Sequence, residues 1–306
     1  MNQVYLIGAG FTRAVIGEKA PLTHEIMPKL NISKFPEICD DFEKAFPDIE
    51  QFLSILDLKY LHFQQINKSF ADHINVIRQN IIQQVVELVD INNLNIEKLE
   101  KYSLLKRFVT SIPNKSYLLT LNYDCVLDQS LYLSNRWSPI GGYNYTNFPI
   151  TRNENISKDQ IIVLKLHGSC NFRDTEDDQP YPTIEINNRI FPDINSNVNP
   201  GGNPHVLVMS YIKQFHNGIM SLWREAISVL KEADKLIVIG CSLREEDTFL
   251  RFALYHFGMK EKNDKFFIEI IDKGNGSIIK NKIERLVANP DKQEITLWDE
   301  GLESYK

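Results

Sequence analysis

The chain has 306 residues, of which 43% are hydrophobic and 24% charged, and its formal net charge is −6. This much apolar material is enough for a packed core of one large or two smaller units. The acidic balance argues against broad binding to a phosphate backbone, because nucleic-acid binders usually display a basic stripe. We therefore predict a soluble globular protein without direct nucleic-acid binding.

Apolar runs such as 236–240 are far shorter than the ~20 residues that span a bilayer, so no membrane span is predicted. The N-terminus starts a strand pattern at once and shows no secretory signal, which favours the cytoplasm. The cysteines are widely scattered without a C-x-x-C pair, which fits neither a disulfide framework nor a zinc ribbon. We expect no metal and small core cysteines at Cys39, Cys125, Cys170 and Cys241.

Short strand patterns recur between amphipathic helical patterns, at 4–7, 116–121, 161–166, 205–209, 235–240, 266–272 and 295–298. Most of these runs lack polar alternation, which is typical of strands buried on both faces. Interleaved helices then indicate a parallel sheet. The predicted fold class is α/β with a doubly wound parallel sheet, in a single domain over 1–306.

Two segments interrupt this alternation. Residues 37–110 hold successive helical patterns without a convincing strand, which predicts an all-helical insertion between the first and second strands. Residues 170–204 are polar and rich in Asn, Pro and Gly, and we expect a long loop there with a small hairpin about Asn187 and Asn188. Loops of such length are often lids or binding loops.

The first strand pattern stops at Gly8, Ala9 and Gly10 and turns into a helical pattern. Such a turn presents backbone N–H groups and the positive end of a helix, a ready site for phosphate. A dehydrogenase fingerprint would have a third glycine where Arg13 stands, so the motif is weak by itself. A tight turn without a ligand is the alternative.

Polar residues follow the next two strands. Asn122 and Asp124 come at the end of the second strand, and the carboxyl ends of parallel strands share one crevice. Asp124 could equally cap the following helix, whereas Asn122 lies too early to do so. His167, followed by Gly168, ends the third strand pattern and suits general-base chemistry, although a single histidine is more often structural.

Two further candidates lie near the C-terminus. Gly240 would let a ligand approach the backbone closely, and Ser242 with Glu245 has the S-x-x-E spacing of a capping box. The predicted helix N-terminus would offer a second site for an anion or a hydroxyl. Asp272 closes a strand pattern and suits ribose hydroxyls, with a solvated loop acid as the alternative.

In chain order, GAGFT (8–12), TLNYD (120–124), LKLHGS (164–169) and GCSL (240–243) resemble the sirtuin motif series. The sequence is most similar to the sirtuin-like family of bacterial antiviral defence proteins, over residues 8 to about 250. The resemblance implies a Rossmann-like sheet whose motifs surround NAD+. The residues expected to bind NAD+ are Gly8, Ala9, Gly10, Phe11, Thr12, Gly168, Gly240, Ser242 and Asp272.

The chain departs from true deacylases at two places. Only Cys170 stands where deacylases carry four zinc-binding cysteines, and GEKAPLTHEI (17–26) replaces their Asp-Phe-Arg segment. The resemblance to defence members implies instead that NAD+ is a consumed substrate, hydrolysed between nicotinamide and ribose. It implies that Asn122 positions the attacking water and the ribose, that His167 acts on the ribose hydroxyls or on that water as a general base, and that Asp124 supports the ribose region.

Two alternatives stay open: a protein deacylase or ADP-ribosyltransferase, and a non-catalytic nucleotide sensor. The chain ends at Lys306, soon after the last strand pattern, and defence NADases need a sensor. We therefore expect a homo-oligomer with a separately encoded partner, such as a HerA-type ring ATPase or an Argonaute-like protein. Apolar residues of the insertion would supply the contact surface, unless they pack on the sheet domain; they include Phe42, Phe46, Phe52, Val85 and Val86.

Overall fold

The computed structural model describes residues 2–35, 48–90, 96–143, 160–174, 184–186, 205–207, 209–212, 217–259 and 265–305. The strands are β1 (Gln3–Ile7), β2 (Tyr117–Thr120), β3 (Ile162–Lys165), β4 (Gly168–Asp174), β5 (Ile184–Ile186), β6 (His205–Leu207), β7 (Lys235–Ile239), β8 (Phe266–Ile271) and β9 (Gln293–Trp298). The α-helices are α1 (Ala9–Ile16), α4 (Ile49–Ile66), α5 (Lys68–Val89), α6 (Ile96–Lys101), α7 (Ser103–Ser111), α8 (Val126–Leu133), α9 (Pro139–Gly142), α10 (Asn217–Glu232), α11 (Thr248–Tyr255) and α12 (Gly276–Leu286). Short 3₁₀ helices include η1 (Thr23–Glu25).

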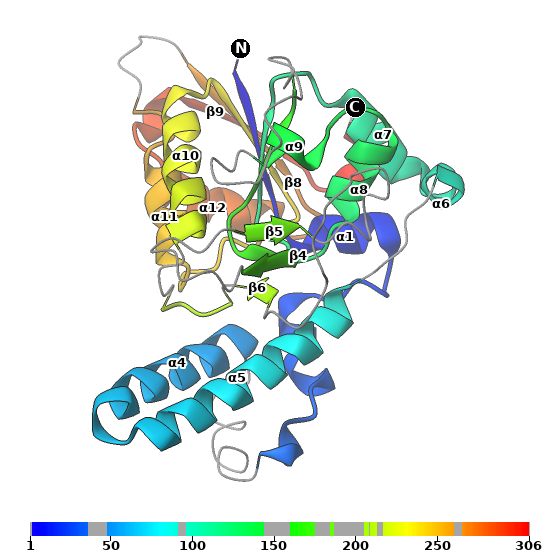
Figure 1. Ribbon diagram of the computed structural model, residues 1–306. Coiled ribbons are helices and arrows are strands. Elements are labelled where there is room, and N and C mark those ends of the chain that lie inside the picture. Colours follow the sequence, from blue (N-terminus) through cyan, green and yellow to red (C-terminus); the bar gives the residue numbers. More distant parts are fainter. Residues whose placement is uncertain are drawn as a thin grey trace.

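Six strands form the main sheet, in the order β3-β2-β1-β7-β8-β9, and every pair in it is parallel (Figure 1). This is the strand order of doubly wound Rossmann-like folds. The connections reverse direction between β1 and β7, which makes this pair the topological switch point of the sheet. The predicted α/β class with a doubly wound parallel sheet is confirmed.

Helices cover both faces of the main sheet, which explains why its central strands β1 and β7 are apolar after their first residue. Helices α10, α11 and α12 gather on one side, whereas α1, α7 and α8 lie on the other (Figure 1). Phe11 of α1 packs on Phe108 of α7, with 5.0 Å between the ring centroids, and Trp223 of α10 is fully buried. Burial of side chains this large contributes roughly 2–3 kcal/mol each to folding.

A second, three-stranded sheet has the order β5-β4-β6 and is antiparallel. The pattern at 205–209 therefore belongs to this sheet and not to the parallel one. Residues 170–174, expected to start a polar loop, belong to β4. Their polarity was misleading because Asn171 is buried and donates to the hydroxyl of Tyr143. The hairpin turn expected at 187–188 lies outside the described residues.

The predicted helical insertion follows β1 and includes a hairpin of α4 and α5 at the carboxyl end of the sheet (Figure 1). Asp48 accepts hydrogen bonds from the first backbone N–H groups of α4, and Asn67 accepts one from Phe70 in α5. Side chains at these capping positions fix where each helix begins. Helices α6 and α7 pack instead on the main core, through Leu99, Leu105 and Phe108.

The inner face of this hairpin is a hydrophobic cluster that also contains Cys170 and Leu207 beside the second sheet. Phe52, Val85 and Val86 are buried in this cluster. The prediction that these three side chains form a partner surface is therefore wrong, because they pack within the chain. Phe42 and Phe46 lie outside the described residues.

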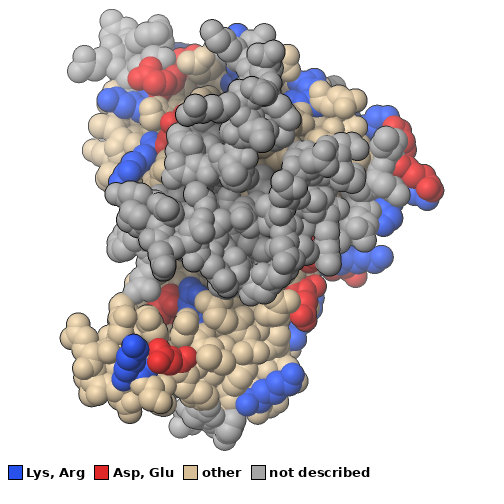
Figure 2. Space-filling model, viewed as in Figure 1, with Lys and Arg blue, Asp and Glu red and all other residues tan. Residues whose placement is uncertain are grey.

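Charges of both signs are mixed on the described part of the face in Figure 2, where Lys and Arg lie among Asp and Glu. That distribution agrees with the acidic net charge and shows no single basic patch on this part of the surface. No helix in the described ranges is both long and apolar enough to cross a membrane.

Candidate active site

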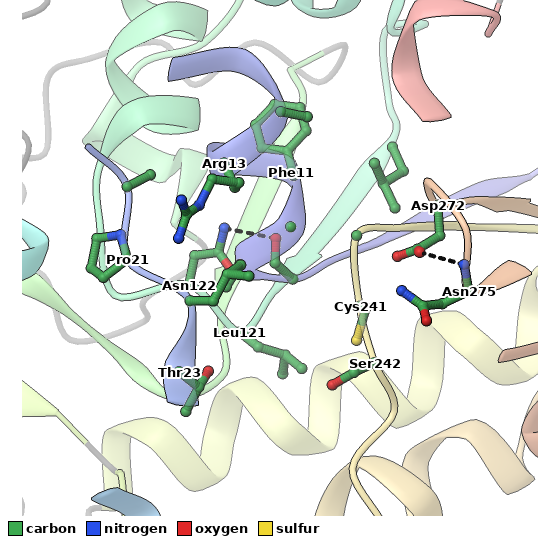
Figure 3. Close-up of a pocket in the computed structure, with 18 of the residues that line it drawn as sticks. Phe11, Arg13, Pro21, Thr23, Leu121, Asn122, Cys241, Ser242, Asp272 and Asn275 are labelled. Atoms are coloured by element: carbon green, nitrogen blue, oxygen red, sulfur yellow. Dashed lines mark hydrogen bonds between the residues drawn. The ribbon is translucent and has the colours of Figure 1, made fainter. Parts of the chain in front are cut away.

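A cavity of about 760 Å³ lies at the carboxyl ends of the main-sheet strands, around the switch point between β1 and β7 (Figure 3). Sites for small molecules and cofactors usually enclose about 300–1,000 Å³, and open α/β sheets bind ligands at such a switch point. The predicted residues that line the cavity are Gly8, Ala9, Gly10, Phe11, Asn122, Asp124, His167, Gly240, Ser242 and Asp272. Thr12 and Gly168 are not among its lining residues.

The two glycine turns at the switch point contact each other through their backbones. The N–H of Gly10 donates to the carbonyl of Gly240 at 2.9 Å, and the N–H of Gly8 donates to that of Ile239 at 3.0 Å. The N–H groups of Gly8 and Gly10 are therefore used within the protein, so the predicted presentation of N–H groups to a ligand does not extend to these two. A Cβ on Gly8 would lie 2.6 Å from the Gly240 oxygen. The close packing of the two turns therefore explains why Gly8 and Gly240 are glycines.

Gly240→Ala is expected to destabilise the fold by more than positive-φ strain alone. Its φ is +52°, and an added Cβ would lie 2.3 Å from the backbone nitrogen of Phe11. Gly274 is the matched control, because its φ is +89° but no atom lies within 4 Å of the added Cβ. Strain alone costs roughly 1–3 kcal/mol. Urea denaturation measures both variants, and equal losses would contradict the packing argument.

The side chain of Asn122 is held in one orientation by a chain of hydrogen bonds. Its amide nitrogen donates to the Gly8 carbonyl at 3.1 Å and to the Thr12 hydroxyl at 3.0 Å, and that hydroxyl donates to Asp124 at 2.9 Å. Since carbonyl and carboxylate oxygens only accept, the amide cannot be flipped. The Asn122 oxygen is buried and has no hydrogen-bond partner among the described residues, so it can accept a hydrogen bond from a ligand hydroxyl or a water.

Asp124 lines the cavity and also accepts hydrogen bonds from two groups of the protein. One carboxylate oxygen accepts from Thr12 and the other accepts from the backbone N–H of Val126 at the start of α8. Asp124 thus binds the first N–H of α8 from the position before the N-cap residue, Cys125. Burial raises the pKa of this carboxyl, and the nearby charge of Lys165 opposes that shift. Both oxygens already have protein partners, so we infer that Asp124 acts mainly by holding Thr12 and Asn122.

His167 pairs with Asp247, a residue that the sequence did not single out. Its Nε2 lies 2.8 Å from Oδ2 of Asp247, while Oδ1 of Asp247 accepts from the backbone N–H of Leu250 at 3.1 Å. Asp247 is thus the N-cap of α11, which begins at Thr248. The capping box expected at Ser242 and Glu245 is wrong; the N-cap spacing from Asp247 to Leu250 was the signal that could have located the true start.

Asn122 and His167 are both buried at the strand ends that carry them. They are only 7% and 5% exposed, respectively. The rings of Tyr123 and Trp223 each lie 6.1 Å from the imidazole of His167, and β4 begins directly after it. Packing by α10 and the second sheet therefore closes the site on the side of β2 and β3.

A cluster of charges connects the insertion to the same cavity. Arg244 contacts Asp48 at 2.6 Å and Glu50 at 3.1 Å, and the hydroxyl of Tyr123 donates to Glu50. Burial alone would lower the pKa of Arg244, but these carboxylates raise it above its usual value. The start of α4 is thus tied to the loop at 241–247, which also carries Asp247. Sequence patterns gave no signal for these contacts, since the partners are almost 200 residues apart.

The far end of the cavity lies at β8. Oδ1 of Asp272 accepts from the backbone N–H of Asn275 at 3.2 Å, and Figure 3 shows both residues across the cavity from Arg13 and Asn122. The described ranges hold no group of three or more His, Cys, Asp or Glu arranged to bind a metal ion.

Neither models of known protein families nor curated protein sequences match the chain. The likeness of the four motifs to the sirtuin-like family stays a prediction. What the cavity does has to be inferred from its position, its side chains and those motifs.

Proposed function

We propose that the protein is an NAD+ hydrolase that cleaves the bond between nicotinamide and ribose. The observation that carries this proposal is the pairing, in one switch-point cavity, of an oriented amide oxygen on Asn122 with the buried His167–Asp247 pair. Oxygen and nitrogen acceptors at this position suit a reaction that develops positive charge on a sugar ring. Hydride transfer would call for the full glycine fingerprint of a dehydrogenase, which Arg13 interrupts.

The shape of the cavity supports a dinucleotide as the substrate. It extends from Asn122 and His167 beside β2 and β3 to Asp272 after β8. We place the nicotinamide ribose near Asn122 and the adenosine ribose near Asp272, whose carboxylate suits the hydroxyls of a sugar. The glycine turns of β1 and β7 would lie between them, under the pyrophosphate.

The proposed reaction breaks the C–N glycosidic bond, and the electron pair of that bond leaves with nicotinamide, which becomes neutral. Water then forms a C–O bond to the ribose and loses a proton to give ADP-ribose. The Asn122 oxygen accepts a hydrogen bond from that water or a ribose hydroxyl, and His167 takes up the proton. Groups held in place before the reaction lower its barrier without reorganisation.

The direct test is to incubate the purified chain with NAD+ and to separate the products by chromatography, with and without EDTA. We expect nicotinamide and ADP-ribose in equal amounts, and no change with EDTA, because no metal takes part in the proposed steps. Release of nicotinamide only after addition of an acylated peptide would favour a deacylase. Calorimetric binding of NAD+ without turnover would favour a nucleotide sensor.

The proposed setting is antiviral defence in the cytoplasm by depletion of NAD+, which depends on the motif resemblance. We infer a homo-oligomer that acts with a separately encoded partner, such as a HerA-type ring ATPase or an Argonaute-like protein. The helical hairpin offers exposed apolar side chains for such contacts, different from those expected: Leu58, Leu61, Ile66 and Val76. Mixed apolar and charged surfaces of this kind are common at protein interfaces.

A further inference from the structure

Asp247 contacts two different parts of the fold with its two carboxylate oxygens. Oδ1 caps α11 by accepting from the backbone N–H of Leu250, whereas Oδ2 faces Nε2 of His167 at 2.8 Å. Both side chains are 5% exposed, so this contact is shielded from water. A helix cap needs only one oxygen, and the second contact therefore has a separate consequence for the imidazole.

That consequence follows from hydrogen-bond chemistry. An ionised carboxylate only accepts, so the Nε2 of His167 must carry a proton where it faces Asp247. In the neutral ring the lone pair is then on Nδ1. We propose that Asp247 is a positioning residue that fixes this tautomer of His167 and stabilises the imidazolium formed when His167 takes up a proton. The catalytic part of this inference rests on the proposed NAD+ hydrolysis, whereas the tautomer itself does not.

The backbone around Asp247 is held on both sides, which keeps the carboxylate in register with His167. Arg244, three residues earlier, is bound by Asp48 and Glu50 at the start of α4. On the other side, α11 begins at once and packs into the core through Leu250. Because the loop is tied at Arg244 and at Leu250, Asp247 has little freedom to turn away from the imidazole.

Asp247→Asn separates the capping of α11 from the contact with His167. Asparagine caps helices as well as aspartate does, so its Oδ1 is expected to keep the N–H of Leu250. The amide NH₂ then faces Nε2 of His167. If Nε2 kept its proton, two N–H donors would point at each other without an acceptor. The neutral imidazole can avoid this conflict by moving its proton to Nδ1. The variant is thus expected to fold normally with the other tautomer of His167.

The experiment is ¹⁵N NMR of the full chain with labelled histidines, in which a His167→Gln variant identifies the His167 signals among the seven. We expect the Nε2–H tautomer in the wild type and the Nδ1–H tautomer in Asp247→Asn. Asp247→Ser, which keeps a cap but offers no amide to His167, is expected to give a mixture. With NAD+, Asp247→Asn is expected to lower kcat by about 10²- to 10⁴-fold with little change in KM.

An unchanged tautomer of His167 in Asp247→Asn would overturn the proposal, and an unchanged kcat in an active enzyme would overturn its catalytic part. A simple loss of stability does not imitate the expected result, since a partly unfolded histidine would not favour Nδ1–H in this variant alone. If the tautomer changes as expected while the wild type does not cleave NAD+, the positioning by Asp247 stands and the proposed hydrolysis fails.

Discussion

Asn122→Ala is expected to lower kcat/KM for NAD+ cleavage by about 10²- to 10³-fold, the usual effect of removing one oriented polar group from a reacting centre. The variant loses the buried amide oxygen that has no hydrogen-bond partner among the described residues and is available to the water or the ribose. It also leaves the Gly8 carbonyl without the amide donor. We therefore expect a simultaneous loss of about 1–3 kcal/mol in the free energy of unfolding.

Ser130→Ala is the matched control for this stability loss. Ser130 is fully buried in α8 and donates to the carbonyl of Leu127, but it does not line the cavity. Its variant should lose a buried hydrogen bond and keep its turnover number. The activities of both variants are compared by steady-state kinetics below their melting temperatures. Their free energies of unfolding are compared by urea denaturation. Similar activity in the two variants would remove Asn122 from the proposed reaction.

The sequence was sufficient to predict where much of the site would lie. Largely apolar runs at β1, β2, β3, β7 and β8 indicated buried parallel strands, and the residues after such strands meet at one edge of a sheet. This rule alone brings Asn122, His167, Gly240 and Asp272 to one cavity. It depends on the order of strands along the chain and not on any side-chain contact, which is why it works from sequence.

Contacts between distant parts of the chain could not be predicted in the same way. The capping-box spacing of Ser242 and Glu245 predicted a helix start there, yet both Gly240 and Leu243 take positive φ and the chain forms a loop. The bonds from Arg244 to Asp48 and Glu50 join the loop to an insertion with no recognisable motif. Only the folded chain brings such partners together.

A buried ionic network that the sequence patterns did not indicate lies beneath the site. Lys165 and Asp128 are 1% and 0% exposed, and Nζ lies 3.4 Å from Oδ2. The same Asp128 oxygen accepts from the hydroxyl of Tyr143 at 2.6 Å, and Nζ also donates to the backbone carbonyl of Asp124. Burial lowers the pKa of Lys165, but the interactions with Asp128, Cys125, Asp124 and Cys170 together outweigh it and raise this pKa to about 12, so Lys165 is charged at neutral pH.

Lys165→Met is therefore expected to lower the free energy of unfolding by about 3–5 kcal/mol, because the buried Asp128 would lose its cationic partner. Lys265→Met is the matched control: its Nζ lies at the same 3.4 Å from Glu294, but these side chains are 74% and 57% exposed. Such a surface pair contributes about 0–1 kcal/mol. Urea denaturation at pH 7 compares the variants, and adding Asp128→Asn to Lys165→Met should restore part of the loss by removing the unpaired charge.

The folded-state pKa of Lys165 is raised from 10.5, so its contribution is present at pH 7 and is lost as the pH rises through about 12. Equal losses in Lys165→Met and Lys265→Met would show that burial of the pair has no energetic consequence.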